Sequence, residues 1–234
     1  MAILNIETAT MVCSVCLSDG GRLLFERTSF DGPSHASLLG IFVNDAVRQA
    51  QMDGRKIEAI AISSGPGSYT GLRIGFSMAK GLCFGWNVPL ISIPTLELLA
   101  HKAIQLVSEP ALYCAMLDAR RMEVFTALYD SSLIKVGNTE AVIVTAGFHA
   151  SLLEKQQIYF FGNGADKCKN LIQSPNAVFL DDLYPQASDM AVLSEQKYRA
   201  KRFEDVAYFE PFYLKDFVAT VPKNKILTKK DEFS

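Results

Sequence analysis

The chain has 234 residues, of which 49% are hydrophobic and 21% are charged, and its formal net charge is −2 at pH 7. This length suits one large domain or two small ones, and a nearly neutral chain lacks the global basic field of a general nucleic-acid binder. The N-terminus has no signal-peptide features, and no apolar run reaches the ~18 residues of a membrane helix, so we expect a cytoplasmic protein that does not enter a membrane.

The first half of the chain predicts strands and helices in alternation. Apolar and β-branched runs, with a turn signal at Asp19-Gly20-Gly21, predict strands, and apolar residues at helical spacing predict helices. The expected strands lie at 2–7, 11–17, 23–27, 57–63 and 90–93, and the expected helices at 35–51, 70–86 and 95–107.

The second expected strand contains Cys13 and Cys16, at a spacing that also occurs in metal and redox sites. In a strand, however, positions three apart point to opposite faces, and no second C-x-x-C or nearby His completes a zinc site. The chain has five cysteines, and an odd number without paired spacing argues against a disulfide framework. We therefore expect a structural role for these cysteines.

The same order recurs in the second half, with strands first and then helix and strand in alternation. Strands are expected at 111–118, 122–130, 133–136, 140–144, 157–161 and 177–180, and helices at 146–155, 165–173 and 187–202. The pattern predicts an α/β protein with mixed sheets in two tandem domains, at 1–105 and 106–220. The polar segment 221–234 is expected to be a disordered tail.

A glycine-rich segment, GPGSYTG at 65–71, opens the helix expected at 70–86. A Walker loop needs four residues between its first glycine and a Gly-Lys pair, whereas five residues lie between Gly65 and Gly71, and Leu72 stands in the place of Lys. The Rossmann pattern also fails, because Thr70 occupies the position of its third glycine. Neither nucleotide motif fits, and a generic anion site at the helix N-terminus stays open.

The expected helix 70–86 carries four glycines, and each lowers helix propensity by about 0.8–1 kcal/mol relative to Ala. Close approach of a neighbouring backbone would offset that cost. Projection of the sequence gives two apolar faces, one with Ile74 and Met78 and the other with Phe76 and Cys83. One face can cover the sheet, and the other needs helix 35–51 or another subunit, unless the fold buries the helix completely.

We expect two copies of the isolated chain to associate through this second face and helix 35–51. The sequence predicts no catalytic, cofactor-binding or metal-binding residue. The predicted interface residues are Leu38, Leu39, Phe42, Gly71, Ile74, Gly75, Met78 and Leu82.

Four segments together resemble one known family. The segment at 65–82, GPGSYTGLRIGFSMAKGL, is similar to the family's long glycine motif, and ILNIETATMVCSVCL at 3–17 is similar to its opening strand and turn. LDARRMEVFTALYD at 117–130 resembles the central D-A-R-x-x-E-V motif, and FYLKDFVA at 212–219 resembles the C-terminal Y-L-R/K segment. The chain therefore resembles the TsaB (YeaZ) family of bacterial proteins over nearly its whole length.

The resemblance implies an actin/Hsp70/sugar-kinase (ASKHA) fold with two related α/β domains. It also implies a scaffold and activating subunit that supplies no catalytic group and holds no cofactor. Such a subunit works with TsaD and the ATPase TsaE, which transfer a threonylcarbamoyl group to the anticodon-loop adenosine of tRNAs reading codons that begin with adenine. TsaD is implied as the partner in a heterodimer that replaces the homodimer at the same helical surface, and tRNA is met only through the complex.

Two departures from related proteins favour the non-catalytic role. TsaD holds its metal with a His-x-x-x-His motif, and Thr95 and Leu99 stand at the corresponding positions here, where neither can serve as an imidazole ligand. Many relatives have Asp where this chain has Glu7, whose extra methylene would shift any carboxylate–metal geometry. A glycoprotease-like metallopeptidase and a small-molecule kinase of the same fold are the alternatives.

Asp118, Arg120 and Glu123 fall together in the central motif, near the expected cleft between the domains. They can form an acid–base cluster, or a polar turn between two strands with Arg–carboxylate pairs. The turn is the interpretation that we favour, and the role of the three residues stays open at this point.

Overall fold

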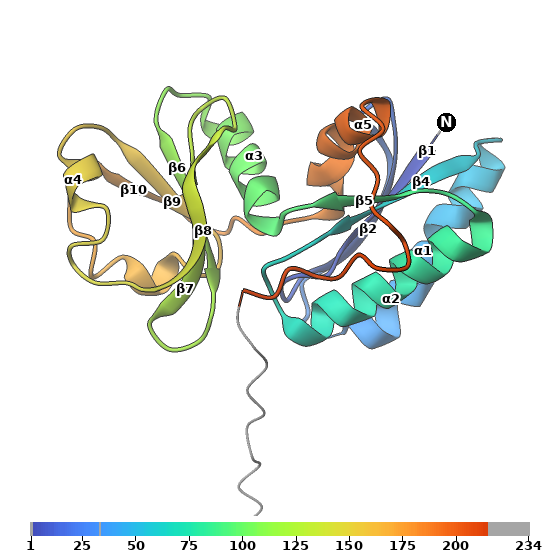
Figure 1. Ribbon diagram of the computed structural model, residues 1–234, viewed down its shortest axis with the longest axis horizontal. Coiled ribbons are helices and arrows are strands. Elements are labelled where there is room, and N and C mark those ends of the chain that lie inside the picture. The colour runs from blue at the N-terminus through green and yellow to red at the C-terminus, as the bar shows by residue number, and fades with distance from the viewer. Residues whose placement is uncertain (1, 33, 215–234) are drawn as a thin grey trace, which may run out of the picture.

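The computed structural model describes residues 2–32 and 34–214, which form two α/β lobes side by side (Figure 1). The predicted tail at 221–234 lies outside the described residues. The strands are β1 (Ala2–Glu7), β2 (Cys13–Asp19), β3 (Arg22–Ser29), β4 (Ile57–Ser63), β5 (Leu90–Ile93), β6 (Leu112–Asp118), β7 (Glu123–Tyr129), β8 (Lys135–Ile143), β9 (Ile158–Phe161) and β10 (Ala177–Leu180). The helices are α1 (His35–Met52), α2 (Tyr69–Trp86), α3 (Thr95–Val107), α4 (Ala150–Leu153) and α5 (Ala191–Arg199), with 3-10 turns η1 (Asp166–Cys168) and η2 (Ala187–Met190).

The two sheets have the same topology. The first has the strand order β3-β2-β1-β4-β5 and the second the order β10-β9-β6-β7-β8. In each, the first strand pairs antiparallel with the next strand and parallel with a later one, as β1 does with β2 and β4, and β6 with β7 and β9. This repeat confirms the predicted α/β class with mixed sheets in two tandem units.

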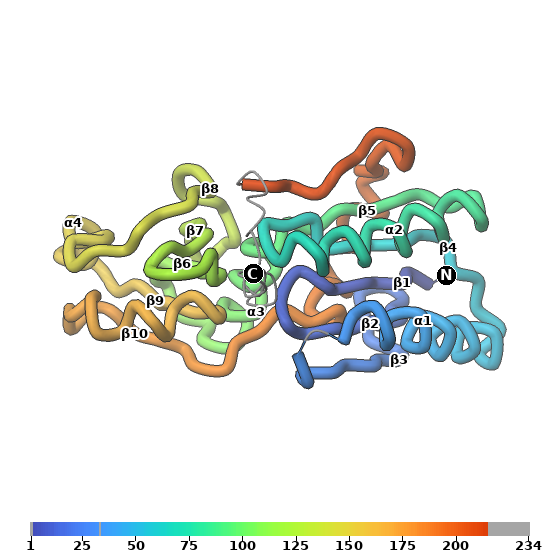
Figure 2. The backbone as a smooth tube through the Cα atoms, turned by 90° about the horizontal axis from the view of Figure 1, so that it is seen from below, coloured from blue at the N-terminus to red at the C-terminus, as the bar shows by residue number. Residues whose placement is uncertain are grey.

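Helices cover both faces of the first sheet. Leu4, Ile6 and Ile60 point to the face covered by α1 and α2, which run side by side along the sheet (Figure 2). Ile3 and Ala59 point to the opposite face, against η2 and α5. This alternation follows from the strand, in which successive side chains face opposite ways. Because both faces are covered, β1 and β4 are apolar along most of their length.

Two helices cover a different sheet from the one that the sequence predicted. The division at 1–105 and 106–220 assigned α3 to the first unit and α5 to the second. In the structure α3 packs on β6 and β7 of the second sheet, whereas α5 packs on β1, β2 and β5 of the first. An amphipathic pattern specifies that a helix has an apolar face, but it does not specify which sheet that face covers.

The second lobe contains less helix than expected. The strands predicted at 133–136 and 140–144 form the single strand β8, and the helices predicted at 146–155 and 165–173 shrink to α4 and η1. The segment after Ala165 makes hydrogen bonds between residues three apart, from Cys168 N to Ala165 O and from Leu171 N to Cys168 O. Such bonds form single 3-10 turns rather than a long α-helix.

Candidate protein-interaction surface

Helix α2 begins and ends at well-defined caps. Ser68 precedes it and its Oγ accepts a hydrogen bond from the amide of Gly71 at 3.2 Å, while Asn87 ends it in the left-handed conformation. The face with Leu72, Phe76 and Cys83 is buried against the first sheet. This fixes which side of the helix is turned toward α1 and solvent.

Two of the predicted interface residues, Gly71 and Gly75, pack inside the fold. A Cβ atom on Gly71 would overlap the carbonyl oxygen of Thr8, and one on Gly75 would overlap the Thr8 hydroxyl group. The predicted close backbone approach is therefore present at these two positions, but the neighbour is the β1–β2 connection of the same chain. The sequence pattern gave no sign that this connection reaches the first turns of α2. A Cβ atom on Gly81 or Gly85 would have no atom of another element within 4 Å.

Leu39 is a third predicted interface residue that the fold buries. It lies on α1 at 1% exposure, within the core formed with β1, β2 and β4. Leu38 and Phe42 are half-buried and pack at the margin of the same core. The helical spacing of α1 put all three residues on a broad apolar face, and the structure turns only part of that face away from the sheet.

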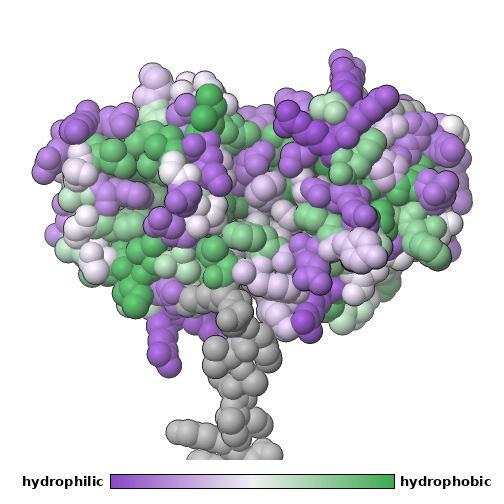
Figure 3. All heavy atoms as spheres, in the orientation of Figure 1, coloured by the Kyte–Doolittle hydropathy of each residue, from purple (hydrophilic) through white to green (hydrophobic). Residues whose placement is uncertain are grey.

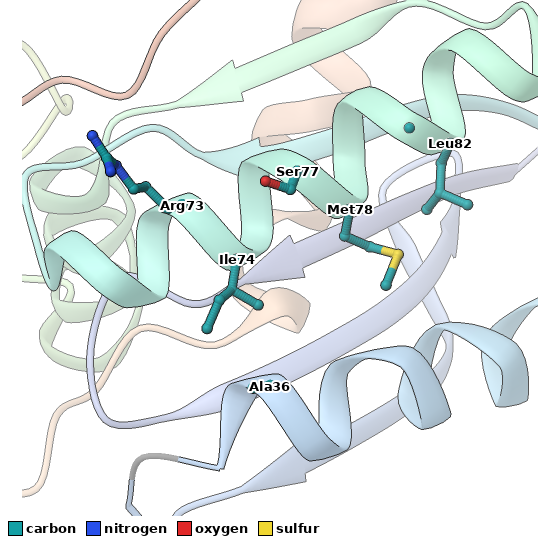
Figure 4. A pocket seen from close by; sticks show the side chains of 7 residues that line it. Ala36, Arg73, Ile74, Ser77, Met78 and Leu82 are labelled. Carbon is teal, nitrogen blue, oxygen red and sulfur yellow. The ribbon is translucent and has the colours of Figure 1, made fainter.

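The remaining predicted residues line a groove between α1 and α2. Ile74, Met78 and Leu82 point from α2 toward α1, where Ala36 faces them (Figure 4). The groove has a volume of about 620 Å³. Sequence reasoning missed Arg73, Ser77 and Gly81, which line the same groove; their spacing of four residues, which puts them along one edge of the helix, is the signal that could have found them.

The C-terminal described segment, 203–214, runs along α2 on the side away from α1 (Figure 2). Lys80 Nζ donates hydrogen bonds of 3.0 Å to the carbonyl oxygens of Ala207 and Phe209, and the Phe209 ring stacks on Phe76 with centroids 5.7 Å apart. These contacts fix the position of α2 from its outer side. The groove is therefore the side of the helix that neither the sheet nor this segment covers.

Arg73 stands at the N-terminal end of the groove in a fixed orientation. Its guanidinium lies 4.1 Å from the centre of the Tyr69 ring, and its Nε donates a hydrogen bond of 3.4 Å to the Tyr213 hydroxyl. An arginine side chain is a cation at any physiological pH, and this hydrogen bond raises the pKa of Arg73 further above its ordinary value. The groove thus combines an apolar floor with one positive charge at its end.

The cluster of Asp118, Arg120 and Glu123 forms a turn at the junction of β6 and β7. The carboxylate of Asp118 pairs with Lys167 and also accepts a hydrogen bond from the amide of Arg120 at 3.2 Å. Lys167 donates a further hydrogen bond of 2.6 Å to the carbonyl oxygen of Glu123. These contacts match the polar turn that we favoured, although the carboxylate pairs with a lysine rather than with an arginine.

The three positions related to a catalytic site, Glu7, Thr95 and Leu99, are all buried. Thr95 Oγ1 accepts a hydrogen bond of 3.1 Å from the amide of Gly65, and Leu99 lies in the core of the second sheet. Glu7 is fully buried, and this burial raises its pKa from 4.5 to about 7. Within residues 2–32 and 34–214, no group of three or more His, Cys, Asp and Glu side chains is arranged to hold a metal ion.

A cleft of about 770 Å³ separates the two lobes. Gly65 and Pro66 line it from the first lobe, Lys135 and Glu140 line it from β8, and Phe212 closes it from the C-terminal segment. In the part of the chain that the structure describes, no helix is both long and apolar enough to cross a membrane.

Comparison with known proteins identifies the family. The family model of TsaD, tRNA N6-adenosine threonylcarbamoyltransferase, matches residues 32–223. The tRNA threonylcarbamoyladenosine biosynthesis protein TsaB of Escherichia coli is 32% identical over 227 residues, which cover 94% of this chain and 96% of that protein. The chain belongs to the TsaB (YeaZ) family. The TsaB of Bacillus subtilis is 26% identical over 92% of this chain and 94% of that protein.

The solved structure of YeaZ from Pseudomonas aeruginosa has the same fold. It superposes with a TM-score of 0.75 at 26% sequence identity, over 91% of this chain and 99% of that chain. The resemblance to the TsaB (YeaZ) family that the four sequence motifs indicated is thus confirmed by sequence and by structure.

Proposed function

We propose that this protein is the non-catalytic scaffold and activating subunit of a cytoplasmic machinery that makes threonylcarbamoyladenosine on tRNA. The observation that carries the proposal is a groove with an apolar floor in a chain of the TsaB family. In this chain, Thr95 and Leu99 stand in the place of a metal-binding His pair. Its role is to bind TsaD, which performs the transfer together with the ATPase TsaE. The chain itself supplies no catalytic group and holds no cofactor.

The partner surface in this proposal is the groove between α1 and α2. The TsaD family model matches most of this chain, so TsaD has an equivalent helix pair to offer. A second copy of this chain offers the same pair, and the homodimer and heterodimer then exclude one another at one surface. The contacts come from the half-buried side chains Leu38, Phe42, Ile74, Met78 and Leu82.

The decisive experiment compares two substitutions of the same kind. Met78→Arg places a charge on the groove floor, whereas Met52→Arg changes an 80%-exposed residue at the end of α1 that does not line the groove. An unpaired charge buried at an interface weakens the free energy of binding by about 2 kcal/mol or more, which corresponds to about thirtyfold weaker binding. We expect Met78→Arg to weaken self-association and TsaD binding by at least that factor, and Met52→Arg to leave both unchanged.

Light scattering and pull-down of TsaD measure the two associations, and far-UV circular dichroism checks the fold. Wild-type binding by Met78→Arg would show that the groove is not the partner surface. The metallopeptidase and kinase alternatives make a different prediction: the isolated protein would bind stoichiometric zinc or iron and cleave glycoproteins, or would bind nucleotide in a titration. Either result would replace the scaffold assignment.

A further inference from the structure

The turn between β6 and β7 has an unusual backbone for its sequence. Arg120 and Arg121 both have positive φ, at 72° and 52°. This left-handed region is unfavourable for residues with a Cβ atom and is normally taken by Gly or Asn. Two consecutive arginines in this conformation, at an exposed turn, are a strained arrangement of the kind that persists at binding and functional sites.

The surroundings of the turn hold this backbone in place. Lys167 Nζ donates hydrogen bonds to the carbonyl oxygens of Arg121 and Glu123, at 2.7 and 2.6 Å, and pairs with the carboxylate of Asp118. Asn163 Oδ1 accepts a hydrogen bond of 3.0 Å from the amide of Asp118. Asn163, in the connection between β9 and η1, and Lys167 of η1 thus fix the turn, and its two arginines have a defined position.

The guanidinium groups themselves remain available. Within residues 2–32 and 34–214, neither the Arg120 nor the Arg121 side chain forms a hydrogen bond or ion pair. Two carboxylates beside the turn are bound to lysines, since Asp118 pairs with Lys167 and Asp166 with Lys169. Among the described residues, the two arginine side chains therefore have no anionic partner.

We propose that Arg120 and Arg121 contact the phosphate backbone of the tRNA substrate. The inference rests on the proposed function, because it names a nucleic-acid contact of the assembly that contains this chain. The guanidinium fork matches the geometry of phosphate oxygens, and two adjacent forks suit successive phosphates. The chain has a net charge of −2, so its affinity for RNA comes from a local site rather than from a basic field.

The turn and the partner groove belong to different lobes. The turn lies at the lower end of the left-hand lobe in Figure 1, and α1 and α2 lie on the right-hand lobe. Because the turn and the groove lie on different lobes, substitutions at the turn leave the groove residues unchanged, and the two surfaces can be tested separately. Figure 3 shows that hydrophobic and hydrophilic residues are interspersed on this face of both lobes.

The test uses the double variant Arg120→Asn/Arg121→Asn. Asn tolerates the left-handed backbone, so the variant removes both charges and is expected to melt at a temperature no lower than the wild type. The matched control is Arg22→Asn/Arg202→Asn, which removes two charges at exposed positions elsewhere. Each protein, alone and with TsaD, is titrated with an unmodified tRNA transcript between about 50 and 200 mM salt.

The expected result is a smaller salt dependence in the double variant. Each phosphate contact contributes about 0.7–0.9 to the slope of log affinity against log salt, so losing two lowers the slope by about 1.4–1.8. The control keeps the wild-type slope. An unchanged slope in the turn variant, an equal loss in the control, or loss of TsaD binding instead of tRNA binding overturns the proposal.

The design separates failure of this contact from failure of the proposed function. If the wild-type protein does not assemble with TsaD, the proposed function falls and the tRNA contact that rests on it falls as well. If assembly is normal and the turn variant binds tRNA with the wild-type slope, the contact is refuted and the scaffold role stands.

Discussion

The buried carboxyl group of Glu7 makes the stability of this protein depend on pH in a direction that can be calculated. Glu7 ends β1 at 0% exposure, and its Oε1 accepts a hydrogen bond of 2.5 Å from the amide of Ala9. Oε2 and the nearby Ser63 hydroxyl have no hydrogen-bond partner among the described residues. The substitution Glu7→Gln removes the ionisable group and keeps an oxygen that can accept from Ala9.

The size of the change in stability follows from the pKa shift of Glu7. Burial raises the pKa of Glu7 from 4.5 to about 7, and the hydrogen bond from the Ala9 amide opposes this rise only in part. Because the pKa is higher in the folded state, the protonated carboxyl favours folding below pH 4.5, and this contribution is lost as the pH rises to about 7. A gap of about 2.5 pH units at about 1.36 kcal/mol per unit amounts to about 3 kcal/mol.

Glu7→Gln should therefore gain stability relative to the wild type as the pH rises. We expect the difference in free energy of unfolding between variant and wild type to increase by about 3 kcal/mol between about pH 4.5 and pH 8. Urea unfolding at several pH values measures this difference. Glu154→Gln, at an exposed position, is the control.

The change with pH carries the test, because a constant offset between the two proteins reflects only the packing of the amide. A difference that stays within about 0.5 kcal/mol over this pH range would mean that Glu7 is ionised at little cost in the folded state. The assignment of a neutral, buried carboxyl group at the end of β1 would then be wrong.

Two further predictions concern α2. Gly75→Ala should lower the free energy of unfolding by about 1–3 kcal/mol, because the new Cβ overlaps Thr8. Gly81→Ala should raise it by up to about 1 kcal/mol, because nothing lies near that position. Equal effects of the two substitutions in urea unfolding would contradict the packing of α2. Lys80→Met should free the C-terminal segment from α2 and speed its removal by a protease at least severalfold, since two hydrogen bonds to Ala207 and Phe209 are lost. A wild-type cleavage rate would mean that these bonds do not hold the segment.

The sequence predicted the strands of the first lobe well because they are buried on both faces. The runs at 2–7, 57–63 and 90–93 match β1, β4 and β5 to the residue, since short apolar runs rich in β-branched side chains favour strands over helices. The second lobe was harder. Its short turns α4 and η1 share the composition of longer helices, and only tertiary contacts limit their length.

The candidate surface was predicted in part for a similar reason. Helical spacing located Ile74, Met78 and Leu82 on the face that lines the groove. The same spacing placed Gly71 and Gly75 with them, because a helical wheel contains no information about Thr8, which reaches the helix from 60 or more residues away in sequence. The positive φ of Arg120 and Arg121 also has no sequence signal, since arginine does not favour such a turn.

The packing of α3 on the second sheet and of α5 on the first sheet makes the two lobes interdependent. Leu98 of α3 packs with Ile91 and Ile93 of the first sheet, while Leu99 on the same helix packs with the second. A fragment ending near residue 105 would leave one face of the first sheet without Met190 and Leu193, so neither half of the chain is expected to survive alone. The two sheets of repeated topology are thus expected to unfold together, because α3 contributes side chains to the cores of both.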